Sequence, residues 1–372
     1  MRPHPVPVKR LRESSSSNPP VSPPESRPAS ERARGADAGA SDRVVFALWR
    51  LAAIIRHPRL HWKYLRRMRR APDLAIPRRF AERMLWRKLF DRDPLFPTLS
   101  DKLAVKGWWA ENAPGLPTPR VLWQGTDPAA IPDALFRPGV AIKCAHGSNF
   151  NILCRDSAPP RREAEARLRA WLARDFGRRR AEWGYRPVPR RVFVEELLIP
   201  PPGEPLWDIK VDAGGGRVGL VMLYRDSRSS AQAALHVDEH GRPVREVSPG
   251  YAALPEATPL PPTFHRAVAL ARTLSAGLDY ARFDFLSAGD ALHGGEVSLY
   301  SASGWWDPAP DIAAATAAMW DLRRSFALRA GLPAGGWLAR RYAAALRRAL
   351  DRDDLSAAAA AGSRPAAPPS PR

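Results

Sequence analysis

The chain has 372 residues, 45% of them hydrophobic, which is enough for one large domain or two lobes around a sizeable core. It has only two cysteines, Cys144 and Cys154, which excludes a disulfide scaffold. Without a matching Cys/His cluster they also exclude a structural zinc site, and a reduced, cytoplasmic setting fits best. The net charge is +20, and residues 50–92 alone carry fourteen Lys/Arg against three acids. The positive charge is therefore concentrated in one segment.

The two ends of the chain have the composition of disordered segments. Residues 1–42 are rich in Pro, Ser and charge, and residues 353–372 are rich in Ala and Pro. Such stretches bury too little apolar surface to fold, so we expect a disordered arm and tail around a folded region of about 43–352. The N-terminus also lacks the apolar core of a signal peptide.

The pattern of residues 43–92 predicts amphipathic helices, each with an apolar face and an opposite basic face. Prolines interrupt them at Pro58, Pro72 and Pro77. The apolar run 44–55 contains Arg50 and is shorter than the roughly 20 residues that span a bilayer. Residues 44–70 could instead lie on a membrane surface, and packing of the same helices on the core is the alternative. No recognition motif supports nucleic-acid binding, which we do not expect.

Residues 93–352 mix short strands with separate helices, which predicts an α+β fold with mostly antiparallel sheets. The expected strands cover residues 120–123, 139–144, 191–198, 207–213, 217–224, 281–286 and 292–299. The expected helices cover residues 102–112, 161–178, 263–277 and 311–349. A turn at 214–216 and a second at 287–290 should each close a hairpin.

Two acids on neighbouring strands are the strongest local signal. Side chains alternate along Ala281–Phe285, so Arg282 and Asp284 share one face, and the return strand carries Glu296 and Ser298. The hairpin can bring both carboxylates together, where they would repel unless a cation lies between them. Mg²⁺ suits a few carboxylates plus nucleotide phosphates. Pairing of either acid with an arginine such as Arg282 is the alternative.

The stretch Ala141-Ile-Lys-Cys-Ala-His-Gly-Ser-Asn149 delivers a lysine from an apolar strand to a small polar loop. Backbone N–H groups of such a loop can bind phosphates while Lys143 neutralises their charge. A mid-strand lysine is more often only on an exposed face. His146 taken alone is more often structural than catalytic.

The strand Arg191–Leu198 contains two acids near its end, Glu195 and Glu196. Backbone groups at such a strand end can read the edge of an adenine ring, and a carboxylate can accept from its amino group. Downstream, Asp208 and Lys210 share one strand face and could meet ribose hydroxyls and phosphates.

The order of these elements resembles the ATP-grasp superfamily, specifically its TupA-like branch of bacterial polysaccharide and teichuronopeptide biosynthesis. The matching stretches are Asp91-Arg-Asp-Pro-Leu95, Asp101-Lys-Leu-Ala-Val105, Ile142-Lys-Cys-Ala-His-Gly-Ser148, Val194-Glu-Glu-Leu-Leu198, Asp208-Ile-Lys210, Arg282-Phe-Asp-Phe285 and Gly295-Glu-Val-Ser298. They run in order across about 90–305. The resemblance implies an ATP-lid lobe at about 115–200, a metal and nucleotide lobe at about 201–310, and C-terminal helices at 311–352, with the nucleotide bound between the lobes.

The resemblance also implies roles for individual residues. ATP would be held by Lys102, Lys143, His146, Gly147, Ser148, Glu195, Glu196, Leu198, Asp208 and Lys210. The Mg²⁺ ligands would be Asp284, Glu296 and Ser298. The catalytic cations would be Lys143, Lys210 and Arg282. The chain departs from the family pattern at three places: Asn149 follows the His-Gly-Ser loop in place of glycine, Ser298 stands where most ATP-grasp enzymes have asparagine, and Ser301-Ala-Ser-Gly304 replaces a Pro-Gly-Ser-Gly-like turn.

The activity that the resemblance implies is an ATP- and Mg²⁺-dependent ligase of cell-surface polysaccharide biosynthesis. It would activate a carboxylate as an acyl phosphate for attack by an amine or similar nucleophile, on a small-molecule or glycan-linked acidic substrate. One alternative is a sugar or phosphosugar transferase of the same pathway, and another is a non-enzymatic basic binding protein. We expect a cytoplasmic protein, with peripheral association at the inner face of the plasma membrane as a further possibility.

Overall fold

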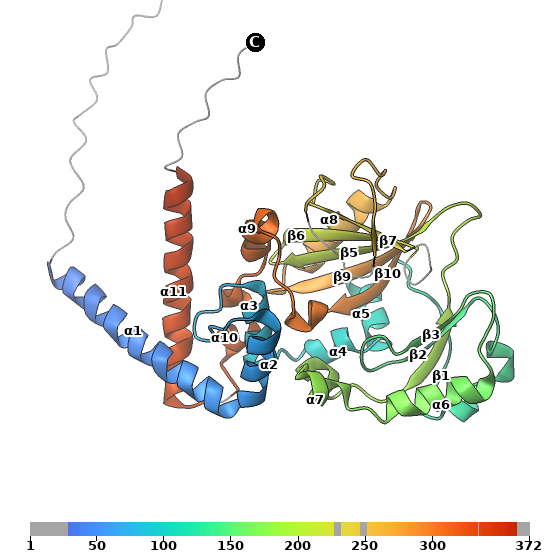
Figure 1. Ribbon diagram of the computed structural model, residues 1–372, viewed down its shortest axis with the longest axis horizontal. Helices are drawn as coiled ribbons and strands as arrows, with labels where there is room; N and C mark the ends of the chain where they lie inside the picture. The colour runs from blue at the N-terminus through green and yellow to red at the C-terminus, as the bar shows by residue number, and fades with distance from the viewer. Residues whose placement is uncertain (1–28, 227–231, 246–250, 334, 363–372) are drawn as a thin grey trace, which may run out of the picture. The chain divides into compact units, whose positions relative to one another are not determined.

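The computed structural model describes residues 29–226, 232–245, 251–333 and 335–362 (Figure 1). By its internal contacts the chain divides into Met1–Arg43 and Val44–Arg372, and the boundary falls inside helix α1, Ala29–Arg56. Everything described below belongs to the second unit, except where α1 itself is named.

The ends differ from expectation where they are described. Helix α1 begins at Ala29 and helix α11 spans Gly336–Gly362, so 29–42 and 353–362 are helical rather than disordered. Both stretches are rich in alanine and free of proline, which favours a helix even without a large apolar face. The expected disorder of 1–28 and 363–372 lies outside the described residues.

Four further helices precede the first strand: α2 Pro58–Met68, α3 Phe80–Phe90, α4 Phe96–Ser100 and α5 Ala104–Asn112. The expected break at Pro58 is confirmed, because this proline occupies the first turn of α2. The expected basic outer face is wrong for α3, where Arg87 and Lys88 are buried. Arg87 pairs with Asp279 at 2.5 Å, a partner far along the chain that no local pattern reveals.

The smaller sheet has four antiparallel strands in the order β1-β4-β2-β3. Its strands are β1 Val121–Gly125, β2 Val140–Cys144, β3 Asn151–Cys154 and β4 Val192–Glu196. Helix α6, Arg161–Leu172, covers one face through Ala164 and Leu168, and the two form a core of their own. The expected helix 161–178 breaks after Leu172, and α7, Phe176–Arg180, starts again with Asp175 as its N-cap.

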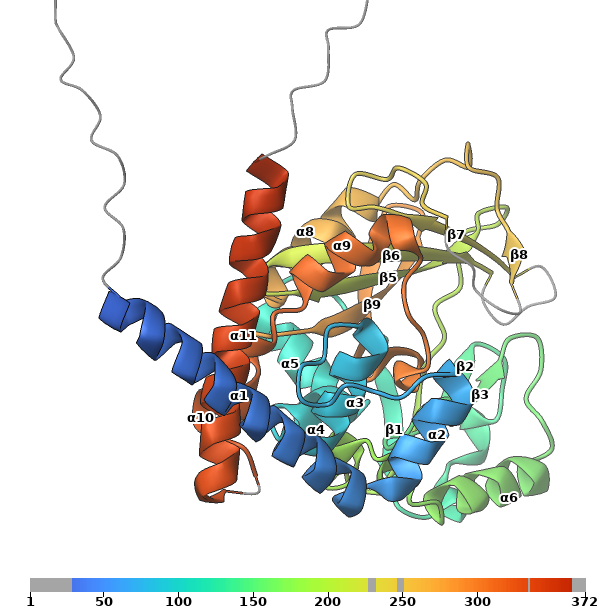
Figure 2. The ribbon, with the colours of Figure 1, turned by 60° about the vertical axis from the view of Figure 1, so that its left-hand side comes forward.

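The larger sheet has six strands in the order β10-β9-β5-β6-β7-β8, all antiparallel except the pair β7–β8. Figure 2 labels β5, β6, β7, β8 and β9 of this sheet. Its strands are β5 Leu206–Gly214, β6 Arg217–Arg225, β7 Ala233–Val237, β8 Ala252–Ala253, β9 Ala281–Ala288 and β10 Ala291–Ser298. Helices α8, Phe264–Leu274, and α9, Pro310–Met319, pack against β5 and β6. The turn predicted at 214–216 is confirmed, with Gly215 and Gly216 at φ 58° and 77°.

The predicted α+β fold with two mostly antiparallel sheets is confirmed. Strands β3, β7 and β8, of four, five and two residues, were not predicted. The expected C-terminal helix is divided into α9, α10 Phe326–Ala330 and α11. A second core, separate from that of the small sheet, joins the large sheet to helices α3, α5, α8 and α11. The linker 197–205 connects β4 of one sheet to β5 of the other.

Candidate active site

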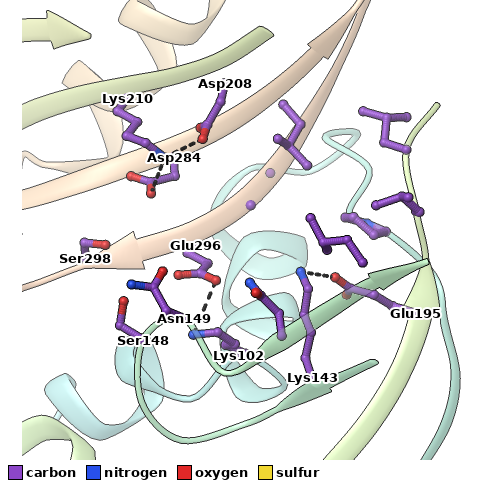
Figure 3. Close-up of a pocket in the computed structure, with 18 of the residues that line it drawn as sticks. Lys102, Lys143, Ser148, Asn149, Glu195, Asp208, Lys210, Asp284, Glu296 and Ser298 are labelled. Atoms are coloured by element: carbon purple, nitrogen blue, oxygen red, sulfur yellow. Dashed lines mark hydrogen bonds and ion pairs between the residues drawn. The ribbon is translucent and has the colours of Figure 1, made fainter. Parts of the chain in front are cut away.

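A cavity of about 330 Å³ lies between the two sheets (Figure 3). The small sheet contributes residues of β2, β3 and β4, and the large sheet contributes residues of β5, β9 and β10. Leu197 and Leu198, from the linker between the sheets, complete one side of it. Residues far apart in the sequence therefore meet in one pocket.

A buried carboxylate marks the small-sheet side of the pocket. Glu195 is 3% exposed, and its two oxygens bind Lys143 Nζ at 2.5 Å and Lys106 Nζ at 2.7 Å. Burial raises the pKa of Glu195, but the two lysines lower it by more, so the pKa lies below its ordinary value and the group stays ionised. Two cations facing one anion leave this side of the pocket with a net positive charge.

Apolar side chains line the space beside this group. Phe193 and Leu153 come from the small sheet, Leu206 and Leu286 from the large sheet, and Leu198 from the linker. A pocket with apolar walls and a few fixed polar groups suits a flat heteroaromatic ring.

The large-sheet side carries a chain of alternating charges. Lys210 on β5 lies directly opposite Asp284 on β9 in the sheet register. Its Nζ binds Asp208 at 2.6 Å and Asp284 at 3.1 Å. The predicted common face of Asp208 and Lys210 is therefore confirmed. Burial, together with the charge of Asp284, raises the pKa of Asp208, although Lys210 opposes the shift.

Arg282 holds Asp284 from the neighbouring position on the same face of β9. Arg282 Nε and Nη2 bind the two Asp284 oxygens at 2.6 and 2.7 Å, and Nη2 also donates to Ser298 Oγ at 3.0 Å. Burial raises the pKa of Asp284, but Arg282 and Lys210 lower it by more, so the carboxylate stays ionised. The pairing of Asp284 with Arg282, which the sequence left as the alternative to metal binding, is present.

A β-bulge directs Glu296 toward the same place. Gly294 pairs with Phe285 and Val297 with Phe283, so both Gly295 and Glu296 lie opposite Asp284. Asp284 and Glu296 both line the pocket, and the charge of Glu296 acts to raise the pKa of Asp284. Lys102 Nζ binds Glu296 at 3.3 Å.

The loop after β2 closes one end of the pocket. Gly147 has φ +88°, and a Cβ there would come within 2.9 Å of Phe150 and Phe176, so only glycine fits. Its carbonyl accepts from Lys102 Nζ at 2.7 Å. Ser148 and Asn149 are exposed at the tip and line the pocket (Figure 3).

Most of the predicted site residues converge on this pocket. Its lining includes Lys102, Lys143, Ser148, Glu195, Leu198, Asp208, Lys210, Arg282, Asp284, Glu296 and Ser298. His146 does not line it, because its ring is buried against Phe150 and lies 3.2 Å from the Trp171 carbonyl. Glu196 does not line it either, because successive strand residues face opposite sides and Glu196 forms an exposed pair with Arg120.

Sequence reasoning missed Lys106 and the apolar side chains of the wall other than Leu198. A signal for Lys106 was present, since it follows Lys102 by four residues within the predicted helix 102–112, and such positions share one helix face. Leu153 had no such signal, because it lies on the short, unpredicted strand β3.

The carboxylates of the large-sheet side bear on whether the pocket can hold Mg²⁺. Among the described residues, no group of three or more His, Cys, Asp or Glu side chains could hold a metal ion by itself. Asp284 and Glu296 do supply two carboxylates on paired strands, and Ser298 lines the same pocket. This set fits Mg²⁺, which often takes one or two carboxylates and completes its shell with water and phosphate.

Comparisons with known proteins give weak similarities. No protein-family model matches the chain, and no curated protein sequence matches it. Among solved structures, it is similar to the ATP-grasp ligase PsnB in complex with minimal precursor, Mg and ADP (17% identity, TM-score 0.32, 62% of each chain covered). It is also similar to D-alanine–D-alanine ligase from Bacillus anthracis complexed with ATP (14% identity, TM-score 0.33, 69% and 68% covered). The chain spans about three fifths of the length of PsnB. TM-scores this low assign no activity to this chain.

Proposed function

We propose that this protein is an ATP- and Mg²⁺-dependent ligase that activates a carboxylate as an acyl phosphate for attack by an amine or similar nucleophile. The observation that carries the proposal is the pocket between the sheets. It has an apolar slot beside Glu195 at one side and a cluster of one lysine and two carboxylates, Lys210, Asp284 and Glu296, at the other. A nucleoside triphosphate has the same polarity, with an apolar base at one end and a metal-binding anion at the other.

Different residues of the pocket would contact the adenine, the ribose and the phosphates of ATP. Leu198 and Phe193 would pack on the adenine, and the Glu195 carboxylate would accept from its amino group. Asp208 would accept from ribose hydroxyls. Lys143 and Lys210 would contact the phosphates, and each would exchange a carboxylate partner for a phosphate oxygen.

In the proposed reaction, a substrate carboxylate oxygen attacks the terminal phosphorus and ADP leaves. The amine then attacks the acyl carbon and phosphate leaves. This chain supplies positioning and positive charge, from Lys143, Lys210 and Arg282, around the transferred phosphoryl group. Mg²⁺, held by Asp284, Glu296 and Ser298, would supply further neutralisation of phosphate charge. We also propose an acidic substrate from bacterial surface-polymer synthesis, supported by the TupA-like sequence motifs.

The test is thermal unfolding with a non-hydrolysable ATP analogue, with and without Mg²⁺. A ligand at about 100 times its Kd that binds only the folded state adds roughly 2.7 kcal/mol of stability. We expect Mg²⁺-dependent stabilisation of the wild type and its loss in Lys143→Met and Glu296→Gln. Arg120→Gln, outside the pocket, is the control and should respond like the wild type. If the wild type gains no stability from adenine nucleotide, the ligase proposal fails.

We further propose that residues 44–65 contact an anionic membrane surface. Seven of the nine exposed large apolar side chains among the described residues lie in this stretch: Val44, Leu48, Leu51, Ile54, Ile55, Trp62 and Leu65. Residues 43–72 contain no Asp or Glu but nine Arg or Lys residues. Apolar side chains flanked by cations alone match a surface of anionic headgroups over acyl chains. No helix among the described residues is long and apolar enough to cross a membrane.

A further inference from the structure

A second cavity, of about 880 Å³, adjoins the first. The two share the loop residues Ser148 and Asn149, together with Tyr185, Arg282 and Ser298. The second cavity extends from there to helix α2, helix α7 and the turn Ser301–Gly304. We call it the basic pocket. Its position beside Arg282 and Ser298 puts it next to the cluster assigned above to the phosphate end of ATP.

Besides Arg282, five cationic side chains line the basic pocket. They are Lys63, Arg67, Arg174, Arg179 and Arg180. In the described part of the chain none of these five forms an ion pair with a carboxylate, although many other arginines do. The lining includes one carboxylate, Glu182, which is 3% exposed and already engaged by Lys88 at 3.2 Å and by Ser303 Oγ at 2.5 Å. The pocket therefore has a strong net positive charge.

Aromatic rings keep several of these cations at the pocket wall. Lys63 Nζ lies 5.1 Å from the centroid of the Trp305 ring, and the Arg67 guanidinium lies 5.6 Å from it. Arg180 lies 5.1 Å from the Phe176 ring. Burial, together with the charges of Arg67 and Arg180, lowers the pKa of Lys63. Like charges held this close repel each other, and an anion between them would remove that repulsion.

The lining of the pocket includes an unusual turn. Ala302 and Ser303 both adopt left-handed backbone conformations, at φ 47° and 53°, which residues other than glycine rarely adopt. Lys88 Nζ holds this turn by donating to the Ser303 carbonyl at 2.9 Å and to its hydroxyl at 2.7 Å. A strained turn maintained by a buried ion network is typical of a functional site rather than of a passive surface.

We propose that the basic pocket binds the acceptor substrate of the enzyme, and that this substrate is a small molecule with two or more carboxylate or phosphate groups. One anionic group lies among the arginines of α7 and the preceding loop, and another lies near Lys63 and Arg67. The reacting group extends past Ser298 toward the first cavity. The role as acceptor site rests on the ligase proposal, whereas the binding of a polyanion does not depend on it.

The test uses two polyanions of different chemistry, citrate and fructose 1,6-bisphosphate, each titrated calorimetrically into the full chain without nucleotide. Arg174→Gln/Arg180→Gln removes two charges from the basic pocket. Arg162→Gln/Arg178→Gln removes two charges from exposed residues on α6 and α7 that do not line either cavity. Both pairs are solvent-exposed, and the contact of Lys88 with residue 180 uses the backbone carbonyl, so the fold should persist.

We expect at least one polyanion to bind the wild type, and its affinity to fall about tenfold or more in Arg174→Gln/Arg180→Gln, since a charge-assisted hydrogen bond is lost at each position. The matched control should stay within about twofold, as expected for removal of exposed charge. Preference for citrate or for the bisphosphate identifies a carboxylated or a phosphorylated substrate.

Binding of the ATP analogue, measured on the same proteins, separates the two proposals. If the wild type binds a polyanion but does not bind the ATP analogue, the ligase proposal fails and the basic-pocket proposal stands. Equal weakening of polyanion binding in the two double variants, or no binding of either polyanion to the wild type, overturns the basic-pocket proposal.

Discussion

Arg282 binds both oxygens of Asp284, at 2.6 and 2.7 Å, so a carboxylate proposed to hold Mg²⁺ is also the anchor of a guanidinium. Both side chains are nearly buried, and Lys210 binds the same carboxylate from the next strand. A cation arriving at Asp284 must therefore share it with Arg282 and Lys210. Phosphate oxygens would attract those two side chains away from Asp284, which couples metal binding to nucleotide binding.

Asp284→Asn tests this coupling. We expect the variant to lose the Mg²⁺-dependent part of the stabilisation by an ATP analogue, because a neutral amide is a poor ligand for Mg²⁺ and no longer anchors Arg282. Transition-state stabilisation should fall by about 3 kcal/mol, as for other lost charge contacts. The variant will itself be less stable, so the ligand shift is measured from its own Tm. Asp290→Asn, in the exposed turn of the same hairpin, is the control. An unchanged response to Mg²⁺ in Asp284→Asn would remove Asp284 from the metal site.

Glu195→Gln and Glu196→Gln should behave differently although the residues are adjacent. Glu195 binds Lys143 and Lys106 in the buried pocket, so removing its charge leaves two lysines without a counter-ion. Breaking a buried pair in this way costs on the order of 3 kcal/mol of unfolding free energy. Glu196 forms only an exposed pair, so its substitution should change neither stability nor nucleotide affinity measurably. Urea unfolding and analogue titration check both. Equal effects of the two substitutions would contradict the placement of Glu195.

Local patterns predicted the parts of the site that lie within one hairpin. Alternation along β9 placed Arg282 and Asp284 on one face, and the glycine-rich turn after β5 predicted its hairpin. Strand alternation also separates Glu195 from Glu196, although the ATP-grasp resemblance had assigned both to ATP. The bulge that directs Glu296 toward Asp284 has no signature beyond its glycine, so it could not be predicted.

Features that depend on distant partners were not visible in the sequence. The basic segment 50–92 predicted an outer basic face, yet Arg87 pairs with Asp279 and Lys88 with Glu182 inside the protein. The basic pocket arises because α2 and α7, more than a hundred residues apart, line one cavity. Charge patterns show how many cations a segment has, whereas tertiary packing decides which of them are buried.

The buried carboxylate of Asp91 should make stability depend on pH. Its Oδ1 accepts from the Ala327 backbone N–H, and burial together with the charge of Asp279 raises its pKa to about 7, against the opposing charge of Arg87. The folded state then binds a proton more tightly than the unfolded state. The stability contributed by this group is full below about pH 4, the ordinary range of an aspartate, and is lost as the pH rises through about 7.

Asp91→Asn, which stays neutral, should therefore be more stable than the wild type at pH 8 and should lose this part of the pH dependence. The gain is on the order of 4 kcal/mol as an upper bound. Unfolding at pH 5 and pH 8 measures it, with Asp93→Asn, a half-buried residue in the same loop, as the control. A destabilised Asp91→Asn at pH 8 would show that the charged carboxylate is needed in the folded protein.

Binding to anionic vesicles tests the exposed apolar stretch 44–65. Leu51 and Ile55 are 56% and 70% exposed, and burying a side chain of this size contributes about 1.5–3 kcal/mol. Leu51→Gln/Ile55→Gln should therefore reduce co-flotation with vesicles of phosphatidylglycerol and phosphatidylethanolamine by at least about tenfold. The matched control is Ile199→Gln/Trp337→Gln, which removes two exposed apolar side chains from outside the stretch. Wild-type binding should also fall on raising the salt and vanish on neutral phosphatidylcholine vesicles, because the flanking arginines act through headgroup charge. Equal flotation of both double variants, or binding that ignores headgroup charge, would exclude residues 44–65 as the membrane contact.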